Sequence, residues 1–234
     1  LNMTKKSSIL LLSPTFPYHS DQRHTPWFVY QFVKNTIDAG VSMTVVSSRS
    51  SELSEEDLEK SESTNFENSV VNRFPYFFTR KMESLTRGES GIPYKLFTNK
   101  EMLSWIQLPF FLFSFFINSI PHAKKCDIIH CQWVMSAIPG LLLKWIFKKP
   151  LYITIRAGNP SLVSNNIILR YIVRNADYLL ATADEYFVHF QICGADSSKF
   201  IKIRNGINPF IQKINKSEVR KKLGLAEDRI ILVT

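Results

Sequence analysis

Short apolar runs alternate along the chain with segments in which apolar residues recur every three or four positions. The runs at residues 9–13 and 151–155 are typical of buried parallel strands, whose two faces are both covered. The spacing at residues 134–147 is typical of a helix with an apolar face. Along the whole sequence these patterns predict strands at 9–13, 41–47, 70–78, 127–131, 151–155, 178–181 and 200–204, the third of them interrupted by Pro75. They predict helices at 25–40, 102–121, 134–147, 167–174, 184–193 and 217–223.

This alternation predicts an α/β fold, a Rossmann-like parallel sheet with helices on both faces. We expect residues 1–208 to form this domain. Residues 209–234 are expected to form a linker and the first elements of a second domain. An apolar run at 229–234 ends the sequence without a helix to cover it, so the sequence is expected to be a fragment.

Local signals mark two helix starts. Thr25 before Pro26 is a favourable start, because threonine caps free N–H groups and proline fits the first helical position. Thr182 and Glu185 have the spacing of a capping box for the helix at 184–193. Residues 79–100 are expected to form a loop.

Charge divides the chain unevenly. The sequence has 29 Lys and Arg against 20 Asp and Glu, and its 45% apolar content excludes the disordered classes. Residues 50–67 hold seven acids and one base, whereas residues 199–222 hold eight bases and one acid. The basic segment favours an anionic lipid surface or a phosphate-bearing substrate, with a solvated basic face as the alternative. Nucleic acid is not expected, because no nucleic-acid motif is present.

The cysteines and the N-terminal residues indicate the cellular compartment of the protein. Cys126, Cys131 and Cys193 form no CxxC pair, which argues against a disulfide scaffold and against a zinc site. The apolar run at 9–12 is too short for a signal peptide. We therefore expect a cytoplasmic protein without a bound metal.

Residues 102–121 contain no charged side chain and many aromatic ones. Twenty such residues are long enough to cross a bilayer. Ser, Gln, Pro and Asn within them count against a span. Three interpretations of this segment are possible: a buried or partly buried helix, a helix lying in a membrane surface, and a transmembrane helix.

Dinucleotide, P-loop, zinc-protease and hydrolase motifs are absent from the sequence. Polar and aromatic residues instead gather in four loops that follow predicted strands. Because the carboxyl ends of parallel strands share one edge, these loops are expected to converge there. The loops are Pro14–Thr25, His130–Trp133, Arg156–Pro160 and Arg204–Asn208.

The order of these motifs resembles the N-terminal half of family 4 (group 1) retaining glycosyltransferases of the GT-B fold. The resemblance covers nearly the whole chain. Five segments carry it: Asp127-Ile128-Ile129-His130-Cys131-Gln132-Trp133, Thr154-Ile155-Arg156-Ala157-Gly158-Asn159, Ala176-Asp177-Tyr178-Leu179-Leu180-Ala181-Thr182, Ile203-Arg204-Asn205-Gly206-Ile207-Asn208 and Arg220-Lys221-Lys222-Leu223-Gly224-Leu225.

The resemblance implies two Rossmann-like domains facing across a cleft, the first binding the acceptor and the second a nucleotide-sugar. It implies no tightly bound cofactor and no metal, with the nucleotide-sugar as co-substrate. Arg156 and His130 are the implied catalytic residues, and Asn205 and Gly206 line the cleft or linker. The implied acceptor-binding residues are Tyr18, His19, Arg23, His24, Thr25, Gln132, Trp133, Gly158 and Asn159.

The residues themselves allow more than one role for several of these positions. His130 and Trp133 are each compatible with a place in the core instead of the cleft. The first loop lacks the glycine pair usual in the family, and Arg156 stands where many members have histidine, which suits a phosphate or carboxylate partner. Tyr18, Trp133, Arg156 and Asn205 are expected to share one pocket wall.

The leading hypothesis is the acceptor-binding part of a retaining transferase that moves a sugar from a nucleotide-sugar to a polysaccharide or lipid-linked acceptor. Inactivity of the isolated chain is expected. The alternative is a non-catalytic Rossmann-like module at an anionic membrane surface. In both cases the expected location is cytoplasmic, peripheral at the inner face of the membrane.

Overall fold

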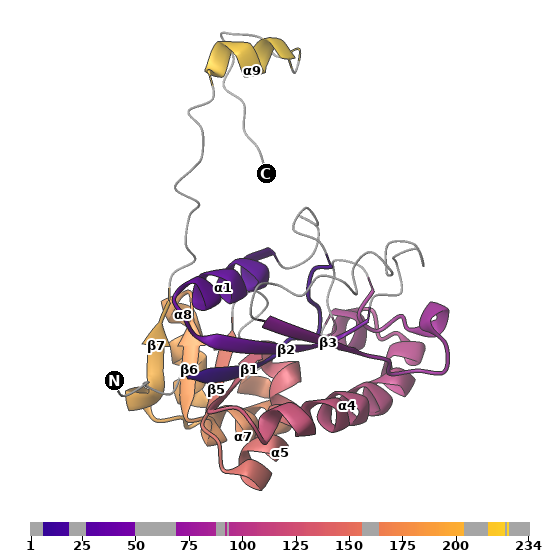
Figure 1. The fold of residues 1–234 in the computed structure, drawn as a ribbon, viewed down its shortest axis with the longest axis vertical. Helices are drawn as coiled ribbons and strands as arrows, with labels where there is room; N and C mark the ends of the chain where they lie inside the picture. Colours follow the sequence, from indigo (N-terminus) through magenta and orange to yellow (C-terminus); the bar gives the residue numbers. More distant parts are fainter. Residues whose placement is uncertain are drawn as a thin grey trace. The chain divides into compact units, whose positions relative to one another are not determined.

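The computed structural model describes residues 7–18, 27–49, 69–87, 92, 94–155, 164–203, 215–222 and 224. The chain divides into two compact units, Leu1–Arg204 and Asn205–Thr234. The first holds the sheet and most helices (Figure 1). In the second, the described element is the short helix α9 (Lys216–Lys222).

The first unit is built on a seven-stranded sheet in which every pairing is parallel. The strand order is β3-β2-β1-β4-β5-β6-β7, so the direction of winding reverses between β1 and β4. In open parallel sheets, ligands bind at the carboxyl end of such a switch point. The strands are β1 (Ser8–Leu12), β2 (Ser42–Ser48), β3 (Ser69–Phe74), β4 (Ile128–Gln132), β5 (Leu151–Ile155), β6 (Tyr178–Ala181) and β7 (Phe200–Lys202).

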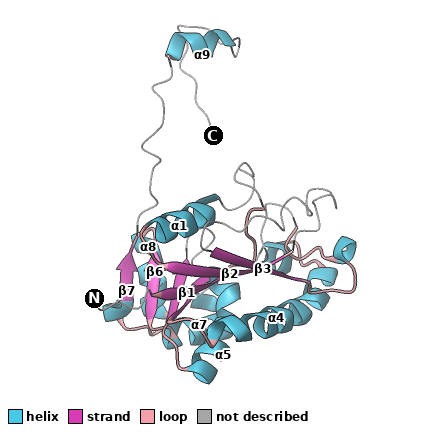
Figure 2. Cartoon of the chain, viewed as in Figure 1, coloured by secondary structure: helices cyan, strands magenta, loops and turns pink. Residues whose placement is uncertain are grey.

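Helices cover both faces of the sheet. Right-handed connections between parallel strands place α1 on one face and α4, α5 and α7 on the other, as the ribbon shows (Figures 1 and 2). The helices of this unit are α1 (Trp27–Asp38), α4 (Met102–Ala123), α5 (Trp133–Phe147), α7 (Ile167–Asn175) and α8 (Asp184–Ile192), with short helical turns η1 (Arg80–Met82), η2 (Tyr94–Thr98) and η3 (Ser197–Lys199). The predicted α/β fold class is confirmed.

The core has two parts, one on each face, because neighbouring residues of a strand point to opposite sides. In β1, Leu10 and Leu12 join the larger cluster, whereas Leu11 joins the smaller cluster under α1. Gly140 lets α5 approach the sheet closely. A Cβ at this position would lie 2.4 Å from Cys131 Sγ, well inside van der Waals contact.

Helix α4 packs against the sheet through one stripe of its surface. Its buried residues are Ser104, Gln107, Phe111, Phe115, Ser119 and Ala123. Within the described parts of the chain, α4 is the helix long and apolar enough to cross a membrane by length and composition. Phe111 and Phe115 contact Phe74 of β3, at ring-centre distances of 5.6 and 4.7 Å. The expectation of a partly buried helix describes this arrangement.

Three local predictions were wrong. The capping box at Thr182 does not form: Ala183 is the N-cap of α8, and no side chain caps the helix. Strand β3 stops at the predicted interruption by Pro75, which has no N–H to continue the ladder, and it does not resume over residues 76–78. Residues 79–100, expected as a loop, include the turns η1 and η2. The predicted helix near 55–60 lies outside the described residues.

Candidate functional site

A row of polar residues crosses four adjacent strands at their carboxyl ends. Gln132 of β4 pairs in register with Thr154 of β5. One position beyond the pairs Leu12–Val46 and Leu12–Cys131, the register brings Ser13 beside Ser47 of β2 and beside Gln132. Adjacent strands are about 4.8 Å apart, so neighbouring members of this row are within reach of one small ligand.

The members of this row are on the α1 face of the sheet. Met43 and Val45 of β2 belong to the core cluster under α1, and Ser47 follows at the same two-residue period. His130, two residues before Gln132, contacts Phe32 of α1. The row therefore lies under α1, across the switch point between β1 and β4.

Gln132 has a polar side chain without a hydrogen-bond partner. The residue is fully buried, and neither its amide oxygen nor its amide nitrogen has a partner in the structure. The hydroxyl of Ser47, in the same row, is also buried and unpartnered. An unsatisfied buried polar group costs about 1–3 kcal/mol, so such groups need an explanation. A ligand with hydroxyl groups would supply the missing bonds.

Trp133 turns the chain sharply from β4 into α5. Its φ angle is 62°, a left-handed conformation that is uncommon for a bulky residue and often marks functional sites. The Ser136 hydroxyl donates to the backbone oxygens of Gln132 and Trp133. The Trp133 ring meets the edge of Phe28 of α1 at 5.8 Å. This turn determines the backbone orientation of Gln132 and Trp133 at the end of β4.

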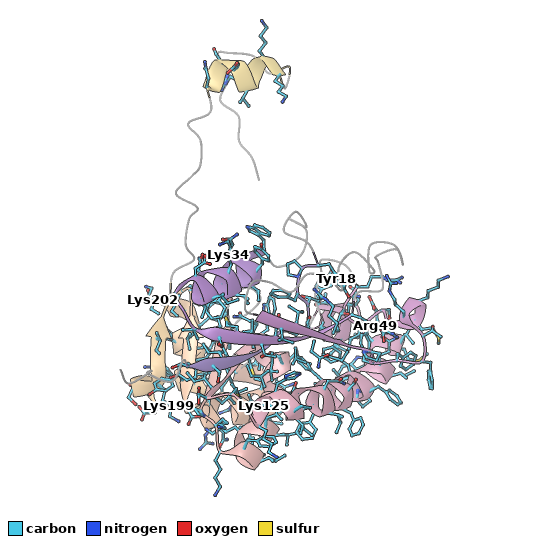
Figure 3. The ribbon with its side chains drawn as sticks, viewed as in Figure 1. Tyr18, Lys34, Arg49, Lys125, Lys199 and Lys202 are labelled. Atoms are coloured by element: carbon cyan, nitrogen blue, oxygen red, sulfur yellow. The ribbon has the colours of Figure 1, made fainter. Side chains whose placement is uncertain are left out.

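Tyr18 lies against Arg73 at the end of β3. The Arg73 guanidinium carbon is 3.5 Å from the Tyr18 ring centre, and its nitrogens donate to the backbone oxygens of Phe16 and Pro17 at 3.0 and 2.7 Å. Burial lowers the pKa of Arg73 to about 10, which still leaves it charged at neutral pH. Figure 3 shows Tyr18 and Arg49 at the same end of the sheet. Arg73 therefore holds the first loop at the carboxyl edge.

His130 lies two residues before Gln132 on β4, further from the carboxyl edge than the polar row. It sits within β4, paired with Leu11 and Tyr152, and is 5% exposed. Its Nε2 is 2.7 Å from Thr154 Oγ1, and its ring meets the edge of Phe32. This position between the sheet and α1 favours a structural role, in which His130 holds Thr154. A catalytic role for His130 stays a prediction.

The structure brings Gln132 and Trp133 together and places Tyr18 at the same edge, nearer to β3. The remaining predicted site residues lie outside the described residues, so their roles stay predictions. These are His19, Arg23, His24, Thr25, Arg156, Gly158, Asn159, Asn205 and Gly206. Arg156 directly follows Ile155, the last residue of β5.

Sequence reasoning missed Ser13, Ser47 and Arg73. Ser13 and Ser47 come directly after apolar residues at the ends of β1 and β2, which was the available signal. Arg73 follows the polar Asn72 in β3 and gave no such signal. The register that aligns Ser13 and Ser47 with Gln132 depends on the order of the strands, which the sequence alone does not determine. Within the described ranges, no group of three His, Cys, Asp or Glu residues is placed to hold a metal.

A shallow hollow lies at the opposite edge of the sheet. It is lined by Lys144, Trp145, Lys148, Lys149, Pro150 and Asp177. Lys144 pairs with Asp177 at 2.8 Å and donates to the backbone oxygen of Asn175. These residues surround the start of β5, so the hollow is separate from the polar row.

Known proteins resemble this chain in fold. No protein-family model matches the sequence, and no curated protein matches it. Anabaena HepE, in a structure with UDP and glucose, aligns over 92% of this chain and 50% of its own, with a TM-score of 0.56 and 15% identity. Sucrose-phosphate synthase from Thermosynechococcus elongatus aligns over 95% of this chain and 54% of its own, with a TM-score of 0.57 and 14% identity.

The chain has the fold of a GT-B half-domain. A shorter chain of the same synthase aligns over 93% of this chain and 96% of its own, with a TM-score of 0.54 and 13% identity. By contrast, this chain spans about half the length of HepE. The polar row lies at the carboxyl edge of this sheet, at the switch point between β1 and β4.

Proposed function

We propose that this domain is the acceptor-binding half of a retaining glycosyltransferase similar to family 4. The reaction moves a sugar from a nucleotide-sugar to a polysaccharide or lipid-linked acceptor at the cytoplasmic face of a membrane. The observation that carries the proposal is the buried amide of Gln132, which has no partner and lies in the polar row at the switch point. HepE, whose fold is similar, was crystallised with UDP and glucose.

The row suits recognition of sugar hydroxyls. The Gln132 amide offers two N–H donors and one oxygen acceptor, and the Ser47 hydroxyl donates and accepts. A hydroxylated ring satisfies both kinds of group at once, whereas an apolar ligand leaves them unsatisfied. The left-handed turn at Trp133 and the support from Ser136 hold the Gln132 backbone fixed, which orients the acceptor before reaction.

Transfer also needs stabilisation of the departing nucleotide diphosphate. In this proposal a second Rossmann-like domain binds most of the nucleotide-sugar, which is a co-substrate, and no bound metal or tightly held cofactor takes part. Arg156, the first residue after β5, contributes a guanidinium that pairs with a phosphate or carboxylate. His19, Arg23, His24 and Thr25 belong to the loop after β1, where acceptor contacts are proposed.

The binding test compares two glutamines of the 234-residue chain. Saturation-transfer NMR is recorded with UDP-glucose and with a panel of oligosaccharide and polyprenyl-phosphate-linked sugars. We expect Gln132→Leu to lose about tenfold or more of the affinity for the acceptor that binds, because a hydrogen bond to a site group is worth about 1–2 kcal/mol. Gln191→Leu, on the exposed surface of α8, is the matched control. Unchanged binding in Gln132→Leu would contradict the proposed site.

The proposal that a second domain binds the nucleotide-sugar is tested by measuring sugar transfer. We expect no sugar transfer by the 234-residue chain alone, and robust turnover by it would overturn the two-domain proposal. The second candidate is a non-catalytic module at an anionic membrane surface, which the apolar outer surface of α4 favours. The complete natural protein distinguishes the two, since the module transfers no sugar from any nucleotide-sugar donor.

A further inference from the structure

The solvent-exposed surface of helix α4 is apolar. Every exposed residue of α4 is apolar, although the helix lies on the outside of the domain. On α1, by contrast, the exposed residues are the polar Lys34, Asn35 and Asp38. The exposed residues of α4 are Met102, Leu103, Trp105, Ile106, Pro109, Phe110, Phe113, Ile117 and Pro121. A continuous apolar stripe of this kind on a soluble domain marks an interaction surface.

Three polar residues of α4, Ser104, Gln107 and Ser119, are buried and hydrogen-bonded. Gln107 accepts the backbone N–H groups of Ser84 and Leu85, each at 3.0 Å, and donates to the backbone oxygen of Met82 at 2.6 Å. Ser119 donates to the Phe115 backbone oxygen. Rotating the helix to bury its apolar stripe would break these bonds, so the orientation of α4 is fixed by the fold.

An aromatic cluster extends the stripe beyond the helix. Phe77 and Phe78, on the segment after β3, pack against Phe110 with ring-centre distances of 5.7 and 6.4 Å. Phe78 is 81% exposed, and Phe113 on α4 is 68% exposed. The Ser114 hydroxyl donates to the Pro75 backbone oxygen and ties this segment to α4. The neighbouring helix α5 adds the exposed apolar residues Leu142, Trp145 and Ile146.

Lysines stand at both ends of the stripe. Lys81 and Lys100 are exposed before α4, and Lys124 and Lys125 are exposed directly after it. The nearby acids are engaged within the domain: Glu83 pairs with Arg49, Glu101 accepts the Ser104 hydroxyl, and Asp127 accepts from Ser8. An apolar, aromatic surface with basic ends matches the interface of an anionic bilayer.

We infer that the outer face of α4, with Phe77 and Phe78, lies in the plane of an anionic lipid bilayer. The helix stays in its place in the fold and does not cross the membrane, because Gln107, Phe111 and Phe115 attach its inner face to the domain. The connection from β3 to β4 runs α4 from the carboxyl edge of the sheet to its amino edge. The proposed membrane surface therefore extends along the domain from one edge of the sheet to the other, on the face opposite to α1.

The docking surface is separate from the polar row, because α4 and the row lie on opposite faces of the sheet. Membrane binding and sugar binding can thus fail independently, and the following experiment contains no sugar.

The experiment is co-sedimentation of the 234-residue chain with phosphatidylglycerol/phosphatidylethanolamine vesicles and with phosphatidylcholine vesicles. We expect binding to the anionic vesicles and about tenfold or more weaker binding by the variant Phe78→Ser/Phe110→Ser/Phe113→Ser, since each buried aromatic ring contributes strongly. Lys124→Gln/Lys125→Gln is expected to weaken binding at low salt and to have little effect at about 1 M salt, where charges are screened. Val188→Ser, an exposed apolar position on α8, is the control.

Position in the bilayer is read from Trp105, which is 45% exposed. Brominated lipids are expected to quench the fluorescence of the chain, and the quenching is expected to fall in Trp105→Phe. Circular dichroism and thermal unfolding check that each variant folds. Equal binding to phosphatidylcholine, wild-type binding by the triple phenylalanine variant, or self-association that removes the stripe without vesicles would each overturn the inference.

Discussion

The guanidinium of Arg49 donates to both carboxylate oxygens of Glu83, at 2.8 and 3.0 Å. Glu83 is fully buried and also accepts the backbone N–H groups of Tyr76 and Phe77, at 2.7 and 3.1 Å. One carboxylate thus joins the end of β2 to the segment that carries the exposed phenylalanines. The position of the proposed docking surface depends on this pair.

We expect Glu83→Gln to lower the free energy of unfolding by about 3 kcal/mol, because it leaves the Arg49 charge partly buried without its partner. The measurement is chemical denaturation at neutral pH. Asp38→Asn is the control, since it removes an exposed pair with Lys34 that contributes about 0.5 kcal/mol or less. A loss as small as that of the control would show that Glu83 does not hold the segment.

Gly140 gives a second stability prediction. A methyl group here would lie 2.4 Å from Cys131 Sγ and 3.2 Å from Leu151 Cδ1, so Gly140→Ala should destabilise the fold by about 1–3 kcal/mol. At a helical position without this contact, the same change would stabilise by up to about 1 kcal/mol. The sign of the change in thermal denaturation is therefore decisive.

A double-mutant cycle separates the two effects of Gly140→Ala. Cys131→Ala removes the sulfur that the new methyl group would meet. We expect Gly140→Ala to be less destabilising in the Cys131→Ala background than in the wild type. Additive losses would mean that the contact with Cys131 is not the cause.

The fold was predictable because its signals are local. Buried parallel strands are short and apolar, and β5 and β6 begin and end at the predicted residues. Contacts with residues distant in the sequence were not predictable in the same way. Gln107 in particular reads as a polar interruption of an apolar segment, and only the position of residues 82–85 explains why it faces inward.

The candidate site was predictable in its location and less so in its members. Gln132 and Trp133 follow a strand directly, so their place at the carboxyl edge follows from the pattern. Ser13 and Ser47 could not be assigned, because alignment with Gln132 requires the order β2-β1-β4. The depth of His130 likewise depends on α1 covering this part of the sheet.

Gln132→Leu should not destabilise the domain. The side chain has no hydrogen-bond partner, so leucine removes an unsatisfied buried group without breaking a bond. We expect the free energy of unfolding to stay the same or to rise by about 1 kcal/mol. The measurement is urea denaturation, paired with the acceptor-binding test. A loss of about 2 kcal/mol or more would indicate that the amide has a structural partner.

His122 is expected to make stability depend on pH. The Asn72 amide nitrogen lies 3.1 Å from His122 Nε2, a contact in which the ring accepts only when neutral. Burial, and secondarily the charge of Lys125, lower the pKa of His122 below its usual value. The folded state therefore binds fewer protons than the unfolded state as the pH falls below about 6.5.

Because the folded state binds fewer protons, the free energy of unfolding decreases as the pH falls. The contribution of His122 is fully present above pH about 6.5, and it decreases as the pH falls toward the lowered pKa of the folded state. Urea denaturation between pH about 7.5 and about 5 should show a smaller decrease for His122→Gln than for the wild type. Lys124→Gln, which changes a neighbouring charge and keeps the Asn72 contact, should retain the wild-type decrease. Equal pH dependence in His122→Gln and the wild type would rule out His122 as a source of acid sensitivity.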